Sequence, residues 1–216
     1  MSLRGEDAGI ILNEKVLEES GLTETHLRNA ILELNELVDA LDTALVDHHV
    51  QRLSRMVELA NLSSMLGNIF AAAVAQHSNE IFVRNGPHKY PDLLSKNDRY
   101  DDIEIKVALE TNKPKGHLIK IGRYLTCRYV LCDEEGNAKF DKTDRGVIPW
   151  IWEVRCGVLG EEHFSVSNTE GDSGKTAVVN AEGMLELKIV YLDVEKMPYS
   201  EKSRIRKELL ALAESS

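Results

Sequence analysis

The sequence predicts an α+β fold, in which a helical region is followed by a mixed β-sheet flanked by helices and by a final helix. Two patterns carry this prediction. From residue 80 onward, short apolar runs separated by turn residues are typical of strands. In the first third of the chain, apolar residues recur at alternating spacings of four and three, which is typical of a helix with one apolar seam; they are Leu27, Ile31, Leu34, Val38, Leu41 and Leu45.

The elements are expected in the following order. Thr23 begins the first long helix, and a second helical pattern covers about residues 49–76. Pro198 ends the last strand, and Ser200 is expected to cap a short amphipathic helix. We expect residues 1–79 to form the helical region and residues 80–216 the mixed-sheet core with its C-terminal helix. Strands are predicted at residues 81–84, 92–95, 103–109, 124–132, 147–158, 163–166, 176–180 and 184–192.

Composition limits the class of protein. The 216 residues include 26 Lys or Arg and 36 Asp or Glu, which gives a net charge of −10. No apolar stretch approaches the roughly 18 residues of a membrane span, and no signal segment is apparent. Three cysteines are an odd set for a disulfide scaffold, so we expect a cytoplasmic protein.

The charge is unevenly distributed along the chain. Acidic residues predominate in residues 1–48, whereas residues 103–131 hold six Lys or Arg against two Glu. A local basic footprint of this kind suits a polyanionic partner despite the acidic total. An ordinary solvated basic surface is the alternative.

One group of residues suggests chemistry. Side chains alternate along a strand, so Glu104 and Lys106 share one face while Ile105 points to the other. If Asp92 opens the neighbouring strand, a hairpin brings its carboxylate beside Glu104. Two carboxylates, with the Ile105 carbonyl as a third ligand, would form a Mg²⁺ site. A lysine beside that ion would position or polarise a water molecule, as the hydrolysis of a phosphodiester requires.

Pro91, Asp92, Glu104 and Lys106 resemble the motif of the PD-(D/E)xK nuclease superfamily, which includes many type II restriction endonucleases. The resemblance implies a restriction-endonuclease-like mixed sheet, Mg²⁺-dependent cleavage of double-stranded DNA and, frequently, a homodimer. It also implies that Asp92 and Glu104 are metal ligands and that Lys106 is the catalytic lysine. Such enzymes often add an acidic residue from the preceding helix, a role that Glu58 fills best.

Other readings of these residues stay open. The triplet Glu186-Leu187-Lys188 has the same acid-x-Lys pattern in an expected strand, but no Pro-Asp pair precedes it. Asp102 shares a face with Glu104, and we assign it to the turn rather than to the metal site. Glu104 and Lys106 could also be an exposed ion pair on a surface hairpin with no catalytic role.

A polar loop follows the proposed catalytic strand. Asn112 suits adenine, Lys113 and Lys115 suit guanine or phosphate, and His117 suits phosphate. Residues 165–175 form a second polar tip that could enter a groove of DNA. A surface loop without a partner is the alternative in each case.

The resulting hypothesis is a Mg²⁺-dependent DNA endonuclease, most consistent with a type II restriction enzyme acting as a homodimer. The apolar seam of the first helix would pair two copies, or it packs on the second helix of the same chain. The alternatives are a non-catalytic interaction protein that uses the acidic helical surface and a DNA repair or junction nuclease of the same superfamily.

Overall fold

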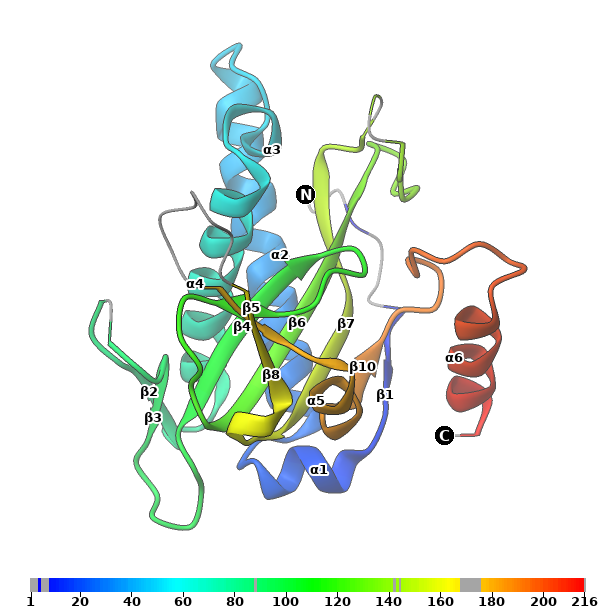
Figure 1. The fold of residues 1–216 in the computed structure, drawn as a ribbon. Helices are drawn as coiled ribbons and strands as arrows, with labels where there is room; N and C mark the ends of the chain where they lie inside the picture. The colour runs from blue at the N-terminus through cyan, green and yellow to red at the C-terminus, as the bar shows by residue number, and fades with distance from the viewer. Residues whose placement is uncertain are drawn as a thin grey trace.

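The computed structural model describes residue 4 and residues 8–87, 89–141, 143, 145–167 and 176–215. Its helices are α1 (Glu14–Glu19), α2 (Glu24–Asp47), α3 (Leu53–Met56), α4 (Leu59–His77), α5 (Ala181–Glu186) and α6 (Arg204–Glu214), with a 3-10 turn η1 (Glu161–His163) (Figure 1). Its strands are β1 (Ile10–Ile11), β2 (Phe82–Arg84), β3 (Leu93–Ser95), β4 (Ile103–Leu109), β5 (Lys115–Gly116), β6 (Gly122–Cys132), β7 (Ile148–Leu159), β8 (Phe164–Ser167), β9 (Thr176–Val179) and β10 (Lys188–Leu192).

The strands form two sheets. The larger has the order β1-β10-β7-β6-β4-β3-β2, and the smaller has the order β5-β9-β8. Within the larger sheet β4 and β6 are parallel, and the other neighbouring strands are antiparallel. A mixed sheet flanked by helices confirms the predicted α+β class.

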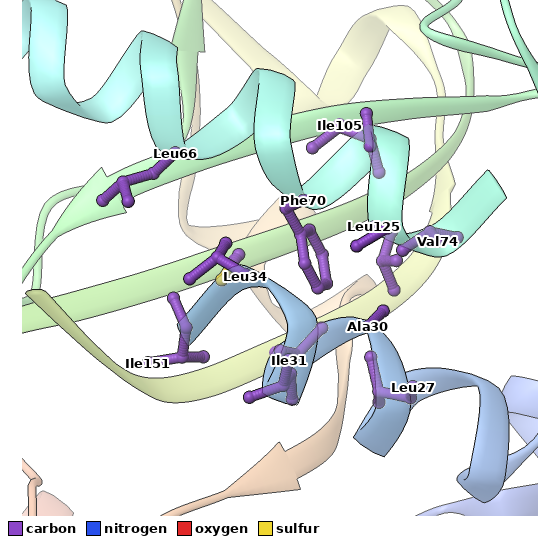
Figure 2. Packing of buried hydrophobic residues seen from close by; sticks show 14 of the residues in the cluster. Leu27, Ala30, Ile31, Leu34, Leu66, Phe70, Val74, Ile105, Leu125 and Ile151 are labelled. Carbon is purple, nitrogen blue, oxygen red and sulfur yellow. The ribbon is translucent and has the colours of Figure 1, made fainter. Parts of the chain in front are cut away.

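Helices α2 and α4 cover one face of the large sheet. Figure 2 shows Leu66 and Phe70 of α4 and Ile31 of α2 packed against Ile105 of β4 and Leu125 of β6. The odd-numbered residues of β4 therefore belong to the main hydrophobic core. Because side chains alternate, Glu104 and Lys106 point to the opposite face.

The opposite face lies toward the small sheet and α5. Tyr124 of β6 is in the same apolar cluster as Val179 of β9 and Leu187, and Phe164 of β8 packs against that cluster. In Figure 1 the strands β5, β8 and β9 lie in front of β4 and β6, while α2 and α4 lie behind them. The side chain of Glu104 therefore lies on the face of the large sheet that the small sheet and α5 cover.

The N-terminal region follows the prediction in part. Thr23 caps α2 by accepting a hydrogen bond from the backbone N–H of His26 at 3.3 Å, as expected. The first four residues of the seam, from Leu27 to Val38, are buried, whereas Leu41 is exposed. These four residues pack within the chain, because α2 lies against α4. The region expected to be helical also contributes β1, which pairs with β10 at the sheet edge.

The C-terminal third departs from the prediction at two points. The strand expected from residue 184 begins only at Lys188, because the side chain of Asn180 accepts from the N–H of Gly183 and starts α5. The triplet Glu186-Leu187-Lys188 therefore crosses a helix end and is not a strand triplet. The cap of α6 is Ser203 rather than Ser200.

Within the described part of the chain, no helix combines the length and the apolar character that crossing a membrane requires.

Candidate metal and nucleic-acid site

The pairing of β3 with β4 brings Asp92 and Glu104 together. Leu93 pairs with Ile103, so the residue before Leu93 lies beside the residues that follow Ile103. The β3 strand begins at Leu93, and the next outward-facing N–H of β4, that of Ile105, donates to Oδ2 of Asp92 at 2.9 Å. A carboxylate thus continues the hydrogen bonding of the sheet where the partner strand has ended.

Glu104 is an almost fully buried carboxylate, with 1% of its surface exposed. Its Oε1 accepts a short hydrogen bond from Nζ of Lys106 and another at 2.9 Å from Nζ of Lys120. Its Oε2 is buried and accepts no hydrogen bond from the described residues. A buried carboxylate oxygen that accepts no hydrogen bond is energetically costly, which makes Oε2 the oxygen of Glu104 best suited to a further ligand.

The two carboxylates influence each other. Burial raises the pKa of Asp92, and the negative charge of Glu104 raises it further. The hydrogen bond from Ile105 and the charge of Lys106 lower the same pKa, but the net direction is upward. Carboxylates that are buried close together attract a hard cation, because one divalent ion relieves both the repulsion and the desolvation.

The residues at this position fit a Mg²⁺ ion by the chemistry of their donor atoms. Mg²⁺ in proteins is often held by one or two carboxylates, with water and substrate phosphate completing the shell. The Ile105 carbonyl, the expected third ligand, here accepts from Nζ of Lys106 at 3.1 Å. Among the described residues no group of three His, Cys, Asp or Glu side chains is arranged to hold a metal, so the candidate centre is a pair of carboxylates.

Sequence reasoning missed three residues of this site, Lys120, Tyr90 and Tyr124. Nζ of Lys120 lies 4.5 Å from the ring centroid of Tyr90. The hydroxyl of Tyr90 donates to the carbonyl of Ile121 at 2.6 Å, and that of Tyr124 donates to the carbonyl of Lys120 at 2.7 Å. Lys120 lies just before β6, whose parallel pairing sets Tyr124 opposite Glu104.

Both tyrosines stay protonated beside the carboxylates. Burial raises the pKa of Tyr90 and of Tyr124, and the negative charge of Glu104 is the second cause in each case. Their hydroxyls therefore remain hydrogen-bond donors over the physiological pH range. Through these hydrogen bonds the two tyrosines hold the backbone carbonyls of Lys120 and Ile121 in place.

Asp102 belongs to the turn, as expected. Its Oδ1 accepts from the backbone N–H of Ser95 at 2.8 Å across the β3–β4 connection, and the residue is exposed. Its charge contributes to the raised pKa of Tyr90, so it lies near the rim of the site rather than among its buried groups.

Glu58 is not brought to the two carboxylates, and we correct that expectation. It is an exposed residue at the start of α4, the helix that packs on the other face of the sheet. The carbonyl of the next residue, Leu59, accepts from the hydroxyl of Tyr129, which pairs with Leu109 at the far end of β4. The sequence did not reveal this because it does not show which face of the sheet the helix covers or where along the sheet the helix begins.

The residues expected to contact DNA lie between β4 and β6. Asn112, Lys113, Lys115 and His117 are all exposed. The segment returns to the site at Gly116, where a Cβ would lie 3.8 Å from Cε of Lys106. Lys115 and His117 flank this position, whereas Asn112 lies four residues earlier along the segment. The second expected DNA contact, residues 165–175, falls mostly outside the described residues.

A buried ion network lies further along the same face. Glu153 of β7 accepts from Arg128 of β6 at 3.0 Å and from Arg155 at 2.8 Å. Nε of Arg128 also donates to the carbonyl of Asn112 at 3.1 Å. The network therefore connects the centre of the sheet to the loop that follows β4.

Comparisons with known proteins give no match: no family model fits the sequence, and no curated protein matches it.

Proposed function

We propose that the protein is a Mg²⁺-dependent endonuclease that hydrolyses phosphodiester bonds in double-stranded DNA. One observation carries the proposal: β3 and β4 bring Glu104, a buried carboxylate whose Oε2 accepts no hydrogen bond from the described residues, beside a second carboxylate, Asp92, with Lys106 on the same strand face. This donor set is what a hard cation and a phosphate require together.

Asp92 and Glu104 are the residues that would hold the ion. When bound, Mg²⁺ neutralises negative charge on the phosphate and lowers the pKa of coordinated water. The main-chain amide of Ile105 fixes the direction of the Asp92 carboxylate, and burial fixes that of Glu104. The chain thus supplies two oriented negative groups at one point of a rigid sheet.

Lys106 supplies a positive charge at the same point. Its ammonium group reaches both Glu104 and the carbonyl of Ile105, so it can donate to a water molecule or a phosphate oxygen that approaches these atoms. In hydrolysis, the water oxygen bonds to phosphorus, one P–O bond of the backbone breaks and the leaving oxygen takes a proton. A fixed ammonium group stabilises the negative charge that builds up on the phosphate.

The basic segment supports DNA as the substrate. Lys113, Lys115 and His117 are exposed on the segment that passes near Lys106 at Gly116, where a Cβ would lie 3.8 Å from Cε of that lysine. Phosphate contacts of this kind position a nucleic acid without reading its sequence, whereas Asn112 is suited to a base edge. Within this proposal, a type II restriction enzyme that acts as a homodimer is the specific form, and a repair or junction nuclease is the other.

A non-catalytic interaction protein is the second candidate. The observation that favours it is the surface of α2, where Leu32, Leu37 and Leu41 are exposed on an acidic helix. Such a surface fits a protein partner, including a second copy of this chain. The two candidates differ in one property, because only the nuclease needs Asp92 and Glu104 to hold a divalent ion.

Cleavage of plasmid and phage DNA with Mg²⁺ or EDTA tests the proposal. The variants are Asp92→Asn, Glu104→Gln and Lys106→Met, which nearly preserve side-chain volume. The matched controls are Glu186→Gln and Lys188→Met, from the other acid-x-Lys triplet. We expect discrete fragments from the parent and both controls in Mg²⁺, and none from the three site variants or in EDTA.

Discrete fragments of fixed size indicate a sequence-specific enzyme, and cleavage confined to branched DNA indicates the repair or junction form. Intact DNA from the parent in every substrate, together with no heat of Mg²⁺ binding in calorimetry, would refute the nuclease and leave the interaction protein.

A further inference from the structure

Lys120 makes more contacts than a fully solvated surface lysine. Its ammonium group contacts Oε1 of Glu104 at 2.9 Å and lies over the ring of Tyr90. Its own carbonyl and that of Ile121 each accept a hydrogen bond from a tyrosine hydroxyl, from Tyr124 and Tyr90 respectively. Three of these contacts hold Lys120 itself and the fourth holds the backbone of its neighbour Ile121, so the lysine is positioned beside the two carboxylates.

This lysine duplicates a contact that Glu104 already has. Lys106 binds the same oxygen, Oε1, while Oε2 has no partner among the described residues. With both lysines charged and both carboxylates ionised, the charges of Asp92, Glu104, Lys106 and Lys120 sum to zero. The free site is thus electrically balanced before any metal or phosphate arrives.

A divalent ion changes that balance. If it occupies Asp92 and Glu104, the four groups and the ion together carry two excess positive charges, and the ion repels the lysine on Oε1. Lys120 is the more accessible of the two lysines, with 33% of its side chain exposed against 23% for Lys106. It can turn outward without leaving a buried charge behind.

We propose that Lys120 is a second phosphate-binding lysine of this site, which neutralises Glu104 in the free protein and turns to a DNA phosphate once a divalent cation occupies the two carboxylates. The inference rests on the proposed function and adds a residue to it. Lys120 competes with the cation and cooperates with the DNA. Its removal therefore has opposite effects on the two ligands, whereas loss of a merely structural lysine would weaken both.

The test compares Lys120→Met and Lys120→Arg with the parent and with Lys207→Met, a control at an exposed lysine on α6. Calorimetry with Mg²⁺ alone measures cation binding without DNA. Fluorescence anisotropy with short random-sequence duplexes in Ca²⁺, at several salt concentrations, measures DNA binding without relying on cleavage. Circular dichroism and thermal melting check folding, and Lys120→Gln replaces the Met variant if that one does not fold.

We expect Lys120→Met to lower the dissociation constant for Mg²⁺ about fivefold, because it removes a positive charge next to the ion. We expect it to raise the dissociation constant for DNA about fivefold and to reduce the slope of log affinity against log salt by about 1. Lys120→Arg and Lys207→Met should resemble the parent in both assays.

Weaker Mg²⁺ binding by Lys120→Met would overturn the inference, because it would show that the lysine only supports Glu104. An unchanged DNA affinity and salt slope would also overturn it. If the parent binds no Mg²⁺, the proposed function fails and the inference fails with it. If the parent binds Mg²⁺ but Lys120→Met matches Lys207→Met, only the role of Lys120 fails.

Discussion

Two equally buried glutamates of the large sheet should respond in opposite directions when their charge is removed. Glu104 and Glu153 are each 1% exposed, and each accepts hydrogen bonds from two cationic side chains. The perturbation is the same in both cases, Glu→Gln, which preserves shape and removes one negative charge. The neighbours left behind differ, and they determine the change in the free energy of unfolding.

At Glu153 the substitution leaves buried positive charge without compensation. The side chain of Arg128 is only 7% exposed and that of Arg155 is 18% exposed, so neither can turn fully to water. Breaking one partner of a buried ion pair costs about 3–5 kcal/mol. Because Gln keeps one acceptor oxygen, we expect a loss of about 3 kcal/mol, the low end of that range. For a chain of this length such a loss lowers Tm by about 6–12 °C.

At Glu104 the same substitution removes unfavourable contacts. The lysines on Oε1 are partly exposed and can return to water, so each pair contributes at most about 1 kcal/mol. An amide nitrogen in place of Oε2, which accepts no hydrogen bond from the described residues, can donate to Asp92, and a hydrogen bond to a charged group contributes about 1.5–3 kcal/mol. The repulsion between the two carboxylates also disappears. We expect Glu104→Gln to stabilise the fold by about 1 kcal/mol, the difference between these contributions.

Urea denaturation in EDTA at neutral pH, followed by circular dichroism, measures both changes on one scale. The m-value should match the parent in both variants, which shows that the unfolded states are comparable. A loss from Glu104→Gln as large as that from Glu153→Gln would refute the reasoning, because it would mean that Glu104 is an integral ion pair and not a strained pair of carboxylates.

Three further predictions concern metal, pH and packing. Mg²⁺ at about 100 times its dissociation constant should raise the free energy of unfolding by about 2.7 kcal/mol, measured as a shift in the urea midpoint, and Asp92→Asn should abolish the shift. The pKa of Asp92 is raised above its ordinary value of 3.8, so the folded state holds the proton more tightly than the unfolded chain. The stability that this residue contributes is therefore present at low pH and declines as pH rises from 3.8 through the native pKa. In metal-free urea denaturation, the free energy of unfolding of the parent minus that of Asp92→Asn should fall over this pH window. A difference that rises with pH would contradict the prediction. Phe70→Ala should cost about 3–5 kcal/mol in the same assay, because Phe70 is fully buried between α2, α4 and the sheet; a loss below 1 kcal/mol would show that the site collapses around the gap.

The strand that carries the site could be predicted from the sequence because it has a strong local signal. Ile103, Ile105 and Val107 alternate with charged or small residues, and β4 has the predicted bounds. The adjacency of Asp92 and Glu104 also followed from local reasoning, since a hairpin connects them. What alternation could not reveal is that the charged face is covered, so that Glu104 is buried and not a solvated surface group.

The parts that failed depend on contacts distant in sequence or on register. Lys120 reaches Glu104 through the parallel pairing of β4 with β6, and nothing in the sixteen-residue separation between them signals which strand lies next to which. The position of Glu58 before the core predicts a role at the site, but α4 places it at the other end of β4 and on the opposite face of the sheet. The strand expected from residue 184 begins later because Asn180 caps α5, and this local helix signal competes with the apolar run that predicts a strand.

The bond from the amide of Ile105 to Asp92 has a consequence for sequence change. The donor is a main-chain N–H, so any residue except proline at position 105 can make this hydrogen bond. The side chain at that position is constrained only by packing in the hydrophobic core. The backbone of the sheet, and not a particular side chain at position 105, therefore sets the orientation of the Asp92 carboxylate. An arrangement of this kind can persist while most neighbouring residues are substituted, so two proteins that share it need share few identical residues.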